Sequence, residues 1–255
     1  MENPLKHQDQ EEMLLNEEKL PSLIDTMKEM ATQAIPVAFT HFAMLSTIGW
    51  SIHLMKDKDD EALTGAIGLG NSILNLLTVA LFYSLNVGLV SRLSHAYGMG
   101  DMVIFGLSLH RAAIINSILL IPLSTLLYHS YRIFAFIGYD EALSTHTGTL
   151  LAGCIPGLVC FVVYNTLSAY LNGASIFTVP AVCQGLGCFS YYIIAYLTIR
   201  VLDLGIVGVA IAFDVLQFVA CASLITYIVK KNPVPNTLFR SEERRVGKEC
   251  RSRWS

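Results

Sequence analysis

Charge is what this sequence has least of. Only 15% of its 255 residues are charged, whereas a soluble domain of ordinary composition has about a quarter. Uncharged apolar runs of 18 or more residues predict helices that cross a bilayer, because about 20 helical residues span its hydrocarbon core. The composition therefore excludes a soluble enzyme, a nucleic-acid binder and a secreted disulfide scaffold, and predicts an integral membrane protein. From residue 62 to residue 239 the charged side chains are Arg92, Asp101, Arg111, Arg132, Asp140, Glu141, Arg200, Asp203, Asp214, Lys230 and Lys231.

Motifs of catalytic and metal sites are missing as well. The sequence has no recognisable nucleophile–base set, so we predict neither an enzyme nor a bound cofactor. His41 and His53 have no neighbouring carboxylate, and we expect them to pack among helices or sit at the interface. The cysteines of the apolar segments have no CxxC spacing, which predicts free thiols packed among helices. They are Cys154, Cys160, Cys183, Cys188 and Cys221.

The N-terminal segment, residues 1–29, is polar and acidic. It has no basic stretch followed by an apolar core, so it does not resemble a signal peptide. Leu20, Leu23, Ile24 and Met27 fall at helical spacing. They predict an amphipathic lead-in helix at the cytoplasmic face of the membrane.

The uncharged runs predict six membrane-spanning helices between residues 30 and 231. Residues 142–199 hold no formal charge, and a single helix of that length would reach roughly 87 Å, too long for one span. We place a break at residues 172–175, shortly before Pro180, because these are turn and helix-start residues. Pro156 is expected to kink its helix. The predicted spans lie near residues 33–55, 64–90, 110–131, 148–171, 178–199 and 205–229, followed by a cytoplasmic linker at 232–239.

The distribution of basic residues predicts the orientation. With both termini in the cytoplasm, the outside loops hold Lys56, Lys58, Arg132 and Arg200. The inside segments then hold more bases, namely Lys6, Lys19, Lys28, Arg92, Arg111, Lys230 and Lys231. We therefore expect a multi-pass membrane protein with cytoplasmic termini, in a plasma or an organelle membrane.

The last stretch, residues 240–255, reads RSEERRVGKECRSRWS and differs sharply from the rest. As a natural tail it would be a basic segment suited to anionic lipid. It matches the in-frame translation of a common sequencing adapter along its whole length, so we exclude it from fold reasoning. We accordingly expect the natural chain to continue beyond Phe239.

Three blocks resemble a known transporter family. Residues 68–90 read GLGNSILNLLTVALFYSLNVGLV and are followed by SRLSHAYGMGD. Residues 167–182 read LSAYLNGASIFTVPAV, and residues 203–217 read DLGIVGVAIAFDVLQ. In this order, and with Pro36 early in the first span, they resemble the MATE (multidrug and toxic compound extrusion) family over roughly residues 20–232.

The resemblance implies an all-α, polytopic antiporter of twelve helices in two bundles. Such a protein exports organic cations or other amphipathic solutes in exchange for H⁺ or Na⁺. This chain resembles the first bundle only, so its partner would be the missing C-terminal bundle, and we expect the fragment alone to be inactive. The alternatives are a lipid-linked-oligosaccharide flippase of the wider superfamily and a non-transporting receptor or scaffold.

Two departures prevent a transfer of the family's coupling residues. Many prokaryotic members have an Asp in the first helix, where this chain has Ser51. Asn and Asp recur on the family's fifth helix, where this chain has Tyr192 and Tyr196. The candidate coupling residues must therefore be found from the sequence itself.

Polar residues inside the predicted spans are the candidates for the transport pathway. Asp214 is the only acidic residue within a predicted span, and a central Asp costs approximately 2.5 to 3.5 kcal/mol on insertion scales. We expect it to face a cavity and to bind a proton reversibly, or else to reach headgroup water without a function. The other candidates are Gln217, Gln184, Tyr192, Tyr196, Asn71 and Asn165.

Each of these neutral candidates has an ordinary alternative, a hydrogen bond between packed helices. Tyr192 and Tyr196 share a helix face with Cys188, so the two phenols are expected to line one wall. Pro36 is the candidate hinge. Gly153 and Gly157 are spaced as GxxxG and predict close helix contact.

Overall fold

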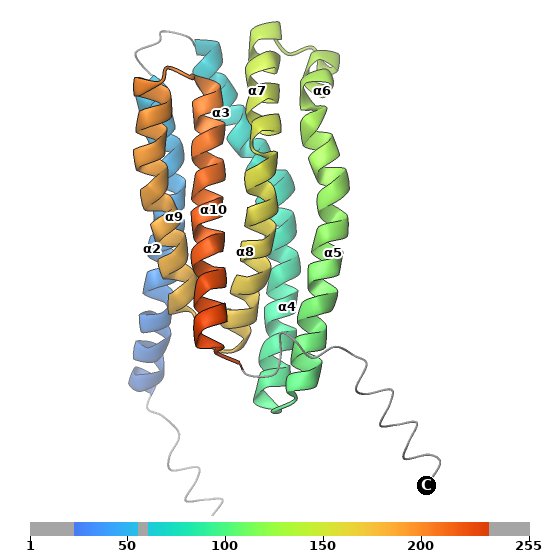
Figure 1. Cartoon of the computed structure of the whole chain (residues 1–255), viewed down its shortest axis with the longest axis vertical. Helices are drawn as coiled ribbons and strands as arrows, with labels where there is room; N and C mark the ends of the chain where they lie inside the picture. Colours follow the sequence, from blue (N-terminus) through green and yellow to red (C-terminus); the bar gives the residue numbers. More distant parts are fainter. Residues whose placement is uncertain (1–22, 56–60, 235–255) are drawn as a thin grey trace, which may run out of the picture.

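The computed structural model describes residues 23–55 and 61–234, and every regular element in these ranges is a helix (Figure 1). The long helices run side by side along one axis, and α2 begins at the same end of the bundle where α10 ends. The elements are α2 (Leu23–Met55), α3 (Glu61–Ile73), the π-helix η2 (Leu74–Val79), α4 (Ala80–Gly98), α5 (Met102–Tyr128), α6 (Ser130–Ile137), α7 (Glu141–Gly153), α8 (Ile155–Gly173), α9 (Thr178–Tyr196), the π-helix η3 (Leu197–Val201) and α10 (Ile206–Lys231).

Within the described residues, five helical segments are long and apolar enough to cross a membrane. They are Ala62–Gly98, Met102–Tyr128, Ile155–Gly173, Thr178–Val201 and Ile206–Lys231. The prediction of an all-α polytopic membrane protein is confirmed. The 33-residue α2 covers the first predicted span but is not among the five, so the count of six stays a prediction.

Helix α2 joins two features that the sequence had separated. It begins at Leu23 and runs without a break to Met55, so the end of the predicted lead-in helix and the first predicted span form one helix. Pro36 lies inside it and does not end it. Leu20 and the linker and adapter-like residues after 234 fall outside the described ranges.

The break predicted near residues 172–175 is confirmed. Helix α8 ends at Gly173 and α9 begins at Thr178, with Ser175 at a positive φ of 63° in the turn between them. A second break follows Gly153, where Cys154 separates α7 from α8 and Pro156 occupies the first turn of α8. The fourth predicted span is thus built from the end of α7 and most of α8, and Pro156 lies in the first turn, where a helix tolerates its missing N–H.

Glycines allow α10 to approach its neighbours closely. A Cβ atom placed on Gly153 would lie 2.8 Å from the Cβ of Ala210, and one on Gly157 would lie 2.9 Å from the Cα of Asp214. The close contact predicted for this GxxxG pair is therefore confirmed. Gly187 on α9 serves the same purpose, because its Cβ would lie 2.7 Å from the carbonyl oxygen of Leu216.

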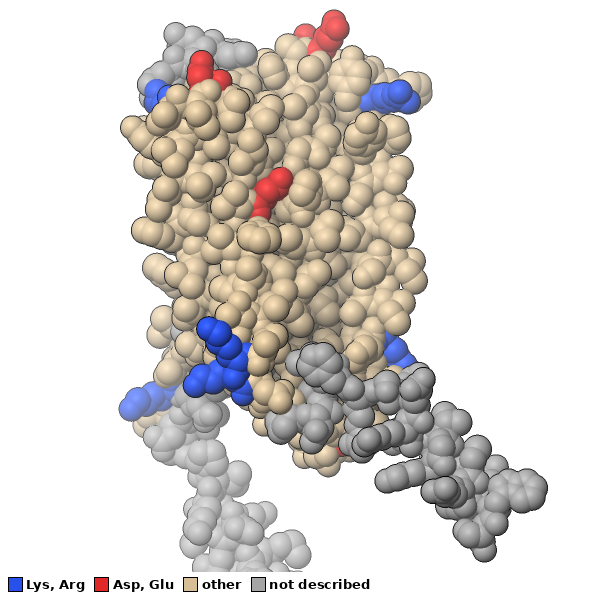
Figure 2. Space-filling view, viewed as in Figure 1, with Lys and Arg blue, Asp and Glu red and all other residues tan. Residues whose placement is uncertain are grey.

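The surface of the bundle is apolar around its middle. Figure 2 shows Lys, Arg, Asp and Glu side chains near the two ends of the molecule, with an acidic side chain interrupting the tan surface between them. Large apolar side chains are freely exposed on the sides, including Phe42, Phe189 and Phe136, of which the last is 92% exposed. Water would penalise so much exposed apolar surface, whereas lipid does not.

The α9–α10 contact gives a direct stability prediction. We expect Gly187→Ala to destabilise the chain by about 1–3 kcal/mol, since the added methyl forces two packed helices apart. Gly185→Ala is the matched control on the same helix, because its Cβ has no atom within 4 Å. Thermal unfolding in detergent, followed by far-UV circular dichroism, should show a lower midpoint for Gly187→Ala only. Equal midpoints would contradict the close contact.

Candidate functional site

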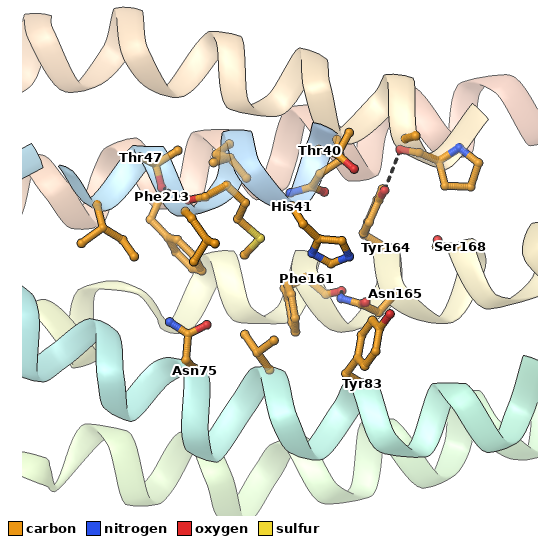
Figure 3. A pocket seen from close by; sticks show the side chains of 18 of the residues that line it. Thr40, His41, Thr47, Asn75, Tyr83, Phe161, Tyr164, Asn165, Ser168 and Phe213 are labelled. Atoms are coloured by element: carbon orange, nitrogen blue, oxygen red, sulfur yellow. Dashed lines mark hydrogen bonds between the residues drawn. The ribbon is translucent and has the colours of Figure 1, made fainter. Parts of the chain in front are cut away.

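A cavity of about 290 Å³ opens inside the bundle, between α2, the α3–η2–α4 segment, α8, α9 and α10. Figure 3 shows side chains from these helices pointing toward a common space. Its aromatic lining comes from α2, α4, α8 and α10 and from the residue before α9. These side chains are Tyr83, Phe161, Tyr164, Phe177 and Phe213, together with the imidazole of His41.

The polar lining of the cavity is neutral. Among the residues that the structure describes, no Asp, Glu, Lys or Arg lines it. The amide side chains on the wall are Asn71, Asn75, Asn165, Asn172 and Gln184. A solute here would meet aromatic faces, amide groups and the imidazole of His41.

The π-helix η2 forms part of the cavity wall. Asn75 and Val79 both belong to this six-residue segment, and the side-chain nitrogen of Asn75 donates to the carbonyl of Asn71 at 2.9 Å. A π-helix inserts an extra residue into a turn and rotates everything beyond it, which is why such segments are frequent at functional sites. Here it brings Asn71, Asn75 and Tyr83 to the same wall.

Three of the predicted pathway residues lie on this cavity: Asn71, Asn165 and Gln184. The side-chain nitrogen of Asn165 donates to the carbonyl of Phe161 at 2.9 Å, one turn back on α8. Gln184 is buried on α9, and its side-chain oxygen has no hydrogen-bond partner among the described residues. The structure thus brings these three amides together, and their role in transport stays a proposal.

Tyr192 and Tyr196 do not line the cavity. The hydroxyl of Tyr192 bonds with that of Ser46 on α2 and donates to the carbonyl of Ala43 at 3.3 Å. Its ring meets Trp50 edge-on at a centroid distance of 5.8 Å. Tyr196 is 52% exposed on the outside of the bundle, so the wall of two phenols expected from their spacing is absent from this cavity.

The neighbouring Tyr191 makes the second α2–α9 contact. Its hydroxyl bonds with that of Ser51, and both residues are buried. Ser51 thus joins α2 to α9 through neutral hydroxyls. No feature of the sequence distinguishes Tyr191 from its neighbour Tyr192 as the more buried contact.

Asp214 has a structural partner rather than a place on the cavity wall. One of its carboxylate oxygens accepts a hydrogen bond from the backbone N–H of Gly157 at 2.7 Å. Gly157 lies in the first turn of α8, where helices have backbone N–H groups without an internal acceptor and where negative charge is favoured. The side chain of Cys154, the residue before α8, makes no capping hydrogen bond, and Pro156 has no backbone N–H to donate. Asp214 therefore caps α8 from α10.

Gln217 and Pro36 lie apart from the lining. Gln217 is fully buried on α10, and neither polar atom of its amide has a hydrogen-bond partner among the described residues. Pro36 lies within α2, before Thr40, the first residue of that helix to line the cavity, and its role as a hinge stays a prediction.

Sequence reasoning missed most of the aromatic wall. His41, expected to pack among helices or to sit at the interface, lines the cavity and contacts Tyr83 edge-on at a centroid distance of 6.3 Å. Tyr164 was missed because it is one of many aromatic residues in apolar spans, and no spacing signal separates inward from outward ones. Its hydroxyl donates to the carbonyl of Pro180 at 2.7 Å.

Comparison with known proteins identifies the family. The model of the MatE family matches residues 35–197. The chain belongs to the MatE family. It is therefore a multi-pass membrane protein of a transporter family, not an enzyme, and transporters of this family use ion gradients.

Individual relatives agree with this assignment. The chain is 25% identical over 206 residues to Protein DETOXIFICATION 39 of Arabidopsis thaliana, covering 79% of this chain and 39% of that protein. It is 27% identical over 166 residues to Multidrug and toxin extrusion protein 1 of Oryctolagus cuniculus, covering 65% of this chain and 29% of that one. The MatE chain described here thus spans less than half the length of these relatives.

A solved structure supports the fold. The crystal structure of the eukaryotic MATE transporter AtDTX14 superposes with a TM-score of 0.75 at 18% identity, over 83% of this chain and 47% of that one. At this identity the similarity speaks for the arrangement of helices alone. The bundle corresponds to about half of that transporter.

The cap on α8 can be tested by two substitutions at one position. Asp214→Asn keeps an oxygen that accepts from Gly157, whereas Asp214→Leu removes it and leaves the N–H unpaired, at a cost of about 1–3 kcal/mol. We expect a lower thermal midpoint in detergent for Asp214→Leu than for Asp214→Asn. If the leucine variant is as stable as the asparagine variant, Asp214 does not cap α8.

Proposed function

We propose that this chain forms one bundle of an efflux antiporter that exports amphipathic solutes, organic cations among them, in exchange for H⁺ or Na⁺. The observation that carries the proposal is the cavity of about 290 Å³, enclosed by apolar helices and lined by aromatic rings and neutral amides. Ligand pockets of about 300 Å³ and more, mostly apolar with a few polar groups, are typical of small-molecule sites.

The lining suits an organic cation without an acidic partner. Aromatic faces attract a cation with roughly 2 kcal/mol when the site is desolvated. Phe161, Tyr164 and Phe213 supply such rings within the bundle. Because the wall has no Lys or Arg among the described residues, it does not favour the phosphate groups of a lipid-linked oligosaccharide, which argues against the flippase alternative.

Charge placement supports cytoplasmic termini. The end of the bundle where α2 begins, α4 turns into α5 and α10 ends is the richer in basic residues (Figures 1 and 2). By the positive-inside rule this end faces the cytoplasm. Among the described residues it holds Lys28, Arg92, Arg111, Lys230 and Lys231, against Arg132 and Arg200 at the opposite end.

For the coupling proton, Asp214 stays the candidate. It is the acidic residue in the middle of a membrane-crossing helix, where an ionisable group is costly and commonly functional. Protonation of its carboxylate would remove a negative charge from the first turn of α8, where that charge is favoured. Proton binding would in this way weaken the contact between α8 and α10, which supplies a physical link between coupling and helix movement.

Transport should require more than this bundle. Alternating access depends on two bundles or repeats that rock about a shared site. Vesicles that contain only the present chain should therefore show no proton-driven uptake of a fluorescent organic cation such as ethidium. Vesicles that contain a protein in which this bundle is joined to a second bundle should show uptake. Gradient-driven uptake by the 255-residue chain alone would contradict the two-bundle requirement.

The coupling role of Asp214 has its own test. In the two-bundle transporter, Asp214→Asn keeps the cap on α8 but cannot lose or gain the proton. We expect its initial uptake rate to lose its dependence on pH between about 5.5 and 8 while the folded yield is maintained. An unchanged pH profile would show that Asp214 does not couple transport to protons and only caps α8.

A further inference from the structure

The outward face of α10 is apolar and is followed by two bases at the end of the helix. Phe218, Ile225 and Val229 are 63%, 41% and 72% exposed, and their spacing places them on one helix face. From Phe218 to Val229 this face extends about 16 Å, which is close to the depth of one leaflet of the hydrocarbon core. Lys230 and Lys231 follow directly in the last turn of α10, and both are exposed.

The positive charge of the two lysines is not offset within α10. The preceding acidic residue of this helix is Asp214, whose place in the sequence puts it about 24 Å from Lys230 along the axis. At the same end of the bundle, the carboxylate of Asp101 accepts hydrogen bonds from two backbone N–H groups at the start of α5. The ammonium groups of α10 are therefore available to an anion from outside the chain.

Helix polarity accounts for the lysines only in part. The carbonyl groups at a helix C-terminus favour nearby cations, and bases gather on the cytoplasmic side of membrane proteins in general. Both effects leave the N–H donors of an exposed ammonium group free to bind an anion. Among the described residues the opposite end of the bundle is acidic instead, because Asp140, Glu141 and Asp203 outnumber Arg132 and Arg200 there.

A third lysine lies at the same end of the bundle as the pair on α10. Lys28 is exposed near the start of α2, and basic side chains gather at the corner where α2 begins and α10 ends (Figures 1 and 2). Asp25 and Glu29 belong to the same helix and offset the charge of Lys28. The lysine pair of α10 is therefore the centre of this basic patch.

We propose that the last turn of α10 binds the phosphate headgroup of an anionic phospholipid whose acyl chain lies along the outward face of the helix. Charge complementarity selects an anionic headgroup, because each base near an anionic lipid surface contributes about fivefold in affinity. The apolar face selects a lipid over free phosphate, because only a lipid has a chain to bury there. This site lies outside the cavity and does not depend on the proposed function.

The test compares two lipids that have the same acyl chains. Dioleoylphosphatidylglycerol is anionic, whereas dioleoylphosphatidylcholine is zwitterionic. Each is titrated into the purified 255-residue chain in detergent, and the bound fraction is measured by native mass spectrometry. We expect the wild type to bind the anionic lipid at least about tenfold more tightly, since two lysines contribute.

Variants assign this preference to α10. Lys230→Gln combined with Lys231→Gln should weaken binding of the anionic lipid about 25-fold and leave the zwitterionic lipid unaffected. Arg92→Gln combined with Arg111→Gln is the matched control, because it also removes two exposed bases from this end, on α4 and α5. It should leave binding nearly unchanged, since salt screens exposed charges beyond about 10 Å. The basic residues 240–255 are the same in every variant, so differences between variants do not arise from them.

Three results would overturn the proposal. Equal binding of both lipids by the wild type would show that the patch does not select an anionic headgroup. Equal losses in the lysine and the arginine variants would assign the preference to the overall charge of this end. Displacement of the anionic lipid by millimolar glycerol 3-phosphate would show a site for free phosphate esters and not for a lipid. None of these results bears on the proposed efflux function, because the cavity takes no part in them.

Discussion

Lipid offers no hydrogen-bond partner, so the backbone polar groups that this chain places at membrane depth have to be satisfied within the bundle. The helices satisfy their own backbones. Where a helix is interrupted, a side chain must replace the missing bonds, and Asp214 does so for the first turn of α8. The same constraint explains why hydroxyl pairs, such as Tyr191 with Ser51, join neighbouring helices here.

The cavity is where polar side chains from several helices gather inside the bundle. Its wall gathers neutral amides and aromatic rings from helices far apart in the sequence, from Asn71 to Phe213. One of these amides, Gln184, keeps an unpaired oxygen. Under the proposed function, a neutral wall of this kind would bind solutes through ring contacts and hydrogen bonds, without the tight ion pairing that would hinder release.

The sequence predicted the helices better than the site. Gaps between charges located the membrane segments, and turn residues located the break between α8 and α9, because both signals are local. The face of a helix that points inward is instead determined by packing against helices that are distant in the sequence. The π-helix at residues 74–79 rotates Tyr83 relative to Asn71, and no residue type in that stretch predicts a π-helix. Asp214, Gln217 and Tyr192 were therefore grouped with Asn165 although the structure separates them.

Cysteine accessibility in vesicles tests most directly whether a polar cavity lies inside a lipid-exposed bundle. In a chain without native cysteines, Asn165→Cys places a thiol on the cavity wall and Phe189→Cys places one on the exposed apolar side. A membrane-impermeant methanethiosulfonate reagent, admitted to both faces of the bilayer, should modify the first and spare the second. Rapid modification at position 189 with none at position 165 would contradict the account.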